Sequence, residues 1–248
     1  PNYEAVFQSA NPVWKKSPLV YPAQLMAGRC AMGRIGYKDA VDYFTHLLGD
    51  TNCTDELLAT QTRFACAAAL MHLDAGTTNA LVNLQTATNL LGQIIRNNGT
   101  NEFAAEAWGG IGDCALQMPE YAAATNAYLH AAATNLAGSV AVRSRAQVGY
   151  GLVLDKLAAQ AVGNEQEALY RQARDNYLAV FYRLNRQGGE VADPFWVKKA
   201  GLLAAPLVGR FDGTRSQRIF YQILQTNLPA LTATIQQRIA ALPPETIE

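Results

Sequence analysis

The sequence carries little charge and no excess of either sign. Charged residues make up 16% of the 248 residues, below the roughly 25% that is usual for soluble domains. Twenty basic and twenty acidic side chains cancel, so the chain as a whole has no positive field that would gather phosphate groups. Nucleic acid is therefore not expected as the main ligand.

Long apolar runs are also missing. No stretch of about 18 apolar residues is present, so no segment is expected to insert into a membrane. No signal peptide is recognisable, yet the first residue is Pro1 rather than Met. The start therefore leaves open a removed leader, lipid anchor or further domain, and with it an exported or cell-envelope location.

Patterns of catalytic or metal-binding residues are absent as well. No two cysteines have C-x-x-C spacing, and the three histidines fall on different predicted helices without H-E-x-x-H spacing. There is no nucleophile elbow and no Walker loop. Gly109-Gly110-Ile111-Gly112 is rich in glycine, but it lies inside a predicted helix, where glycine favours close helix contact. We therefore expect no cofactor, no metal and no enzymatic activity.

Half of the residues are apolar, and in residues 108–131 they recur with a distinctive spacing. This segment reads Trp-x2-Ile-Gly-x2-Ala and then Tyr-x2-Ala-x3-Tyr-x2-Ala. Small residues such as Gly112 and Ala124 stand where two helices must approach closely, while Trp108, Tyr121 and Tyr128 fill the remaining gaps. The segment resembles the tetratricopeptide repeat (TPR), a pair of antiparallel helices.

Two other segments repeat parts of this pattern. In residues 27–47, Gly28 and Tyr37 are separated by the same nine positions as Gly112 and Tyr121. Gly33 and Gly36 are expected at the turn, where glycine tolerates the left-handed backbone that ends a helix. Residues 148–180 end on the same Tyr-x2-Ala-x3-Tyr motif, but Gly149 and Tyr170 are twenty-one positions apart. The extra residues, 156–168, are expected to lengthen the first helix and its turn.

Weaker signals complete the array. Residues 55–73 and 80–95 read as a helix pair, with Ala68 as the small residue of the first helix and an apolar stripe at Leu84, Ala87, Leu91 and Ile94 on the second. A fifth pair is expected from Ala200 to Ile223, with its turn at residues 211–214. Residues 228–242 predict a last helix that covers the end of the stack.

The resemblance implies an all-α fold, a right-handed α-α superhelix of TPR-like solenoid type. About five irregular helical hairpins and a C-terminal capping helix would occupy residues 22–248. Residues 1–21 would form an N-terminal segment or the remnant of an earlier repeat.

In TPR proteins the first helices of successive hairpins line a concave face that binds an extended peptide or a helix of a partner. Arg29, Arg143 and Tyr150 are the expected anchors, because Arg and Tyr are enriched at binding hot spots. The dense Lys/Asn set with which some TPR domains clamp a C-terminal carboxylate is not found. Carried over by position, the face contains Leu25, Arg29, Met32, His72, Glu106, Asp113, Gln117, Arg143, Tyr150, Phe195 and Lys198.

The sequence therefore predicts a non-catalytic scaffold that binds a protein or peptide partner on this concave face. The low charge and the richness in Thr and Asn suit an alternative, in which the chain is a structural segment of a larger multidomain or cell-envelope assembly. The identity of the partner and the oligomeric state stay open.

Overall fold

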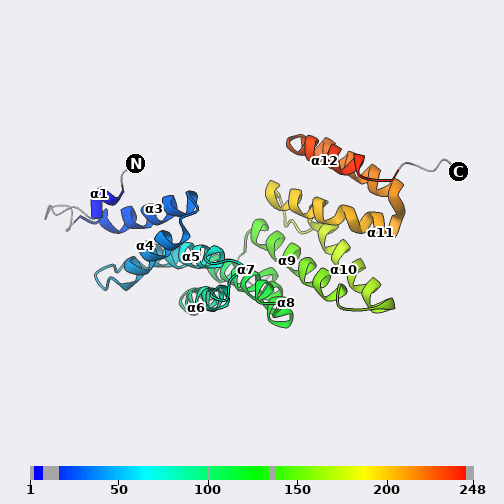
Figure 1. Cartoon of the computed structure of the whole chain (residues 1–248). Coiled ribbons are helices and arrows are strands. Elements are labelled where there is room, and N and C mark those ends of the chain that lie inside the picture. Colours follow the sequence, from blue (N-terminus) through cyan, green and yellow to red (C-terminus); the bar gives the residue numbers. More distant parts are fainter. Residues whose placement is uncertain (1–2, 8–16, 100, 134–137, 244–248) are drawn as a thin grey trace. The chain divides into compact units, whose positions relative to one another are not determined.

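The computed structural model describes residues 3–7, 17–99, 101–133 and 138–243, and every regular element in these ranges is a helix (Figure 1). The predicted all-α class is therefore confirmed. The chain divides into two compact units, residues 1–124 and 125–248. Within each unit, helices that follow one another in the sequence pack together. The superhelical path of the array stays a prediction.

The first unit is built from helices joined by short connections. It contains α1 (Glu4–Phe7), α3 (Val20–Gly33), α4 (Tyr37–Gly49), α5 (Glu56–His72), α6 (Ala80–Asn98), α7 (Glu102–Gln117) and the start of α8 (Tyr121–Ala132). From α3 to α7 each helix packs on the one before it, and α1 packs on α3. Tyr43 of α4 donates a hydrogen bond of 2.6 Å from its hydroxyl to Glu4 Oε1 in α1.

The pair formed by α3 and α4 follows the predicted pattern closely. Gly28 faces the fully buried ring of Phe44, and a Cβ atom added to Gly28 would lie 2.7 Å from Phe44 Cζ. No other residue type allows this approach without a shift of the ring. Ala31 and Ala40 are fully buried on the same two helices. The small and aromatic residues of the motif therefore mark a real contact between helices.

The turn between α3 and α4 corrects one expectation. Ile35 has the left-handed backbone, with φ 64°, whereas Gly33 ends α3 and Gly36 has φ −82°. Gly36 is needed for a different reason. Its N–H donates to the carbonyl of Ala31 at 2.9 Å, and a Cβ atom on Gly36 would lie 3.3 Å from that same oxygen.

The turn that follows α7 closes in the same way. The N–H of Glu120 donates to the carbonyl of Ala115 at 2.9 Å, which is again a bond across five positions. Such bonds satisfy carbonyls that the last turn of a helix leaves without partners. Because Tyr37 and Tyr121 both begin the next helix, the equal spacing seen in the sequence corresponds to equal turn geometry.

The stripe predicted on α6 is confirmed, since its four residues are the buried residues of that helix. On α5, however, Ala68 is only half-buried, and Cys66 and Ala69 take the buried positions. The expected register of this helix was therefore wrong. In an Ala-rich helix nearly every face offers small residues, so spacing alone does not select the packed one.

The second unit contains α9 (Val140–Ala158), α10 (Gly163–Phe181), α11 (Pro194–Asn227) and α12 (Thr232–Ala240), besides the remainder of α8. A short 3-10 helix, Pro229–Leu231, precedes α12. In Figure 1, α9, α10 and α11 lie side by side. α11 is two helical segments joined at Gly213, whose φ is 84°, so the turn predicted at residues 211–214 is confirmed.

Local sequence explains where α11 begins. Asp193 accepts hydrogen bonds from the backbone N–H groups of Phe195 at 2.8 Å and Trp196 at 3.3 Å. Proline at position 194 suits the first helical turn, whose N–H groups have no partner within the helix. This start fixes which residues of α11 point toward α9 and α10.

Three expectations for the second unit need correction. Both α9 and α10 have 19 residues, so the extra residues lengthen the second helix as well as the first. The glycine beneath Tyr177 is Gly151, whereas Gly149 faces Tyr128 of α8. In the last pair Leu224, not Ile223, is fully buried. In each case several small or apolar residues lie within one helical turn, and the neighbouring helix selects among them.

The two ends of the chain are described only in part. α3 already begins at Val20, inside the predicted N-terminal segment, while residues 1–2 and 8–16 lie outside the described residues. The helix predicted for residues 228–242 is shorter than expected. Its Ile235 is fully buried in the apolar core of the second unit. Among the described residues, no helix combines the length and the apolar character that crossing a membrane requires.

Candidate functional site

The residues predicted for the concave face are divided between the two units. Arg29, Met32, His72, Glu106, Asp113 and Gln117 lie in the first unit, and Arg143, Tyr150 and Lys198 in the second. Leu25 is buried, so it is a core residue, whereas Phe195 is 59% exposed. The structure describes each unit by itself, and a continuous face across both stays a prediction.

In the first unit, three of the candidates contact neighbouring side chains. The His72 ring stacks on Tyr37, with ring centroids 5.2 Å apart and an angle of 25° between the planes. Arg29 lies within 3.9 Å of the Met26 sulfur. Met32 packs partly against the apolar core. These contacts leave Arg29, Glu106 and Gln117 on the surface.

In the second unit, Arg143 makes contacts that the sequence did not reveal. Its guanidinium forms an ion pair with Glu190 and donates at 2.6 Å to the carbonyl of Gly138, and its side chain is only 11% exposed. The backbone N–H of Gln187 also donates to Glu190. These two groups hold the pKa of the Glu190 carboxyl below its usual value, the backbone bond first. Arg143 therefore anchors the connection between α10 and α11 to the start of α9.

The second unit also has a groove that residues from four helices line, which we call the cationic groove. Its volume is about 430 Å³, within the range of sites that bind small molecules or side chains. Its walls are apolar side chains of α11, and its polar groups come from α9, α10, α11 and α12. The lining residues are Asp155, Tyr170, Lys199, Leu202, Leu203, Pro206, Leu207 and Arg238.

Asp155 has an unusual environment for a carboxyl group. Its Oδ2 accepts a hydrogen bond of 2.5 Å from the hydroxyl of Tyr177, which is fully buried. Its Oδ1 is buried without a hydrogen-bond partner. Burial raises the pKa of the Asp155 carboxyl, and the hydrogen bond from Tyr177 and the charge of Lys156 only partly oppose this. A buried acceptor without a donor costs free energy, and this cost adds to the burial that disfavours the charged carboxylate.

Three cations, Lys199, Arg210 and Arg238, lie in or near the groove, and two of them contact aromatic rings. Lys199 Nζ lies 5.0 Å from the centroid of the Trp196 ring, and the guanidinium of Arg210 lies 4.5 Å from the centroid of Tyr170. Such cation-π contacts position a charge without neutralising it. In the part of the chain that the structure describes, neither these two cations nor Arg238 forms an ion pair.

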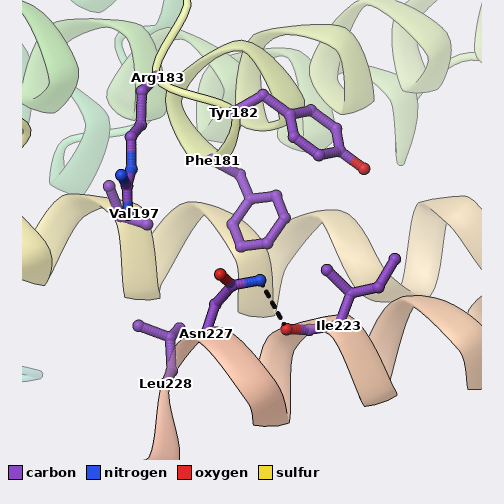
Figure 2. Close-up of a pocket in the computed structure, with 7 residues that line it drawn as sticks. All are labelled: Phe181, Tyr182, Arg183, Val197, Ile223, Asn227 and Leu228. Atoms are coloured by element: carbon purple, nitrogen blue, oxygen red, sulfur yellow. Dashed lines mark hydrogen bonds between the residues drawn. The ribbon is translucent and has the colours of Figure 1, made fainter.

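A second groove of the same unit has different walls. It has a volume of about 250 Å³, and Figure 2 shows the Phe181 ring at its centre, with Arg183 extending along one side toward Val197. On the opposite wall the side-chain amide of Asn227 donates to the carbonyl of Ile223 at 2.9 Å. Tyr182 is 52% exposed beside it. This groove is mainly apolar and has one cation.

The three histidines lie on α4, α5 and α8 and not in either groove. Among the described residues, no group of three or more His, Cys, Asp or Glu side chains is placed to hold a metal ion. The Cys66 thiol is buried, which raises its pKa to about 11. At neutral pH it is therefore a packed thiol rather than a nucleophile.

Sequence reasoning missed the residues of the cationic groove. It selected Lys198, but Lys199 lines the groove, because one position along a helix rotates a side chain by about 100°. Asp155 carries no signal in the sequence, since its importance depends on burial beside Tyr177. Tyr170 was recognised, but only as a packing residue of the motif.

No protein-family model and no curated protein matches this sequence significantly.

Proposed function

We propose that the chain is a non-catalytic scaffold that binds a segment of a partner protein between successive TPR-like hairpins. The observation that carries this proposal is the cationic groove. Residues of α9, α10, α11 and α12 converge there on one opening, and it combines apolar walls with two cations, Lys199 and Arg238, that form no ion pair among the described residues. This combination is typical of binding sites in which a few polar groups orient a ligand.

The helix packing supports the TPR-like part of the proposal. Each of three glycines faces a buried aromatic side chain of a neighbouring helix: Gly28 faces Phe44, Gly149 faces Tyr128 and Gly151 faces Tyr177. Together with the two equivalent turns after α3 and α7, these pairs indicate a repeated helical hairpin. Repeats of this kind form extended binding surfaces because each hairpin contributes the same face.

A protein segment suits the groove better than a compact small molecule does. Pro206 and Arg238 line the groove and are exposed, so the groove is open to a bound chain. An extended segment also offers main-chain N–H donors along its length, which suit a groove lined by the carboxyl of Asp155. Apolar side chains of the same segment would cover Leu203 and Leu207.

Peptide display on the intact chain tests this proposal. A random library of 12-residue peptides is selected on the protein and on a Pro206→Trp variant, in which the indole fills the groove without changing its charge. The control is Leu129→Trp, because Leu129 is 54% exposed on α8 and lines neither groove. We expect enriched peptides that lose binding to Pro206→Trp only. An absence of enriched peptides, or equal binding to both variants, would refute the proposal.

A further inference from the structure

We propose that the segment bound in the cationic groove is an acidic one, in which a carboxylate side chain lies two positions from a large apolar side chain. This inference rests on the proposed function and specifies the chemistry of the partner. It follows from three features of the groove: its cations, the carboxyl of Asp155 and its apolar walls.

The first feature is the charge around the groove. Lys199 and Arg238 line the groove. Tyr170 lines it too, and the guanidinium of Arg210 lies over the Tyr170 ring. None of the three has a carboxylate partner in the described ranges. Residues 125–248 contain 13 basic and 9 acidic side chains, an excess of four positive charges. A ligand with carboxylates therefore complements this unit.

The second feature distinguishes a peptide from a nucleic acid. Asp155 supplies a carboxyl group to the lining of the groove, and its Oδ1 is buried without a hydrogen-bond partner. A peptide supplies N–H groups along its main chain, whereas phosphates would meet this oxygen with more negative charge. The cations attract an acidic ligand, and Asp155 restricts it to one that also donates hydrogen bonds.

The third feature sets the spacing of the side chains. Leu203, Pro206 and Leu207 supply an apolar wall to the groove in addition to its polar groups. In an extended peptide, residues two positions apart point to the same side, about 6 to 7 Å from each other. One such side chain can cover the wall while the other reaches Lys199 or Arg238. The pattern expected in a partner is therefore Leu-x-Glu or a close equivalent.

Binding of defined peptides tests the inference. The probe is the fluorescein-labelled peptide Gly-Ser-Leu-Ser-Glu-Ser-Leu-Ser-Glu with an amidated C-terminus, so that no terminal carboxylate contributes. Matched peptides carry Gln or Lys in place of both Glu residues. Fluorescence anisotropy with the full chain should show affinity lower by about tenfold for the Gln peptide, from the loss of two surface ion pairs, and lower still for the Lys peptide.

Adjacent lysines provide a matched control within the protein. Lys199→Gln and Arg238→Gln should each weaken binding of the Glu peptide by about threefold to fivefold. Lys198→Gln removes the same charge from the next residue, which does not line the groove, and should leave the affinity unchanged. Circular dichroism should show equal helix content for all three variants.

The outcomes separate this inference from the proposed function. Equal affinity for the Glu and Gln peptides would overturn the acidic chemistry, even if display had yielded groove-dependent peptides. Equal effects of Lys198→Gln and Lys199→Gln would overturn the assignment to this groove. The last probe is a single-stranded RNA of 12 nucleotides. If the chain binds this RNA more tightly than the Glu peptide, and if Lys199→Gln weakens the binding of RNA, the choice of a peptide is overturned.

Discussion

The smallest feature on which the fold depends is the contact between a glycine and an aromatic ring. Gly28, Gly149 and Gly151 each face a ring that is almost completely buried. The missing side chain lets two helices approach, and the ring then fills the space beside the bare backbone. In the sequence both partners were visible, but only the structure shows which glycine meets which ring.

Replacing Gly28 with Ala tests this contact. Alanine is favoured over glycine in a helix by about 1 kcal/mol, but the new Cβ atom would collide with Phe44, and overpacking costs about 1 to 3 kcal/mol. The collision should prevail, and the thermal midpoint should fall. Gly33→Ala is the control on the same helix, because no atom lies within 4 Å of its added Cβ. A midpoint for Gly28→Ala that is equal to or above that of Gly33→Ala would contradict the contact.

A second prediction at this scale concerns Asp155. Burial raises the pKa of its carboxyl in the folded chain, above the value of 3.8 for an unperturbed aspartate. The folded state therefore binds this proton more tightly than the unfolded state does. The stability from the neutral carboxyl is fully present below the unfolded pKa and is lost as pH rises through the folded pKa.

Asp155→Asn keeps the shape of the side chain and an acceptor for Tyr177, but it cannot ionise. The difference in thermal midpoint, variant minus parent, should therefore increase between pH 3 and pH 7. Melting curves across this range by circular dichroism measure it. A difference that stays constant or decreases with pH would show that burial does not disfavour the charged carboxylate.

At the scale of helices and turns, regular spacing was a good guide where the residues are distinctive. The stripe on α6 was predicted completely, because its four apolar residues recur at helical spacing. The turn after α3 was placed correctly, but its left-handed residue was not, since Ile35 rather than a glycine adopts that backbone. Propensity favours glycine at such positions, and tertiary packing of α3 on α4 overrides it.

Gly213 provides the element-scale prediction. Its φ of 84° and ψ of 168° join the two segments of α11, in a region of backbone conformation that only glycine adopts readily, at a cost of about 1 to 3 kcal/mol for other residues. No atom lies within 4 Å of an added Cβ, so Gly213→Ala should destabilise the second unit through backbone strain alone. Thr214→Ala is the control. Equal urea midpoints for the two variants would argue against a turn at Gly213.

Binding residues were less predictable than helices for a physical reason. A helix is recorded in the sequence as a repeated pattern, whereas a groove depends on which side chains of different helices converge. Lys198 and Lys199 are chemically equal in the sequence, and only the start of α11 at Pro194 decides which one lines the cationic groove. Arg143 was chosen as an exposed anchor, but its pairing with Glu190, 47 positions away, was not visible.

For the whole molecule, the neutral total charge is the sum of one unit with a negative net charge and one with a positive net charge. Residues 1–124 contain 7 basic and 11 acidic side chains, and residues 125–248 contain 13 basic and 9 acidic ones. Composition summed over the chain therefore understated the positive character of the second unit. Its binding of acidic peptides should weaken as salt rises from about 0.05 to 0.5 M, because exposed ion pairs are screened over this range.

A charge exchange between protein and peptide tests the central claim most directly. The affinities of the parent chain and of Arg238→Glu are measured for the Glu peptide and for the Lys peptide, which completes a double-mutant cycle. We predict that Arg238→Glu weakens binding of the Glu peptide and strengthens binding of the Lys peptide, because Arg238 pairs with the acidic side chain. If the substitution changes both affinities by the same factor, Arg238 does not face the peptide, and the account of the groove is wrong.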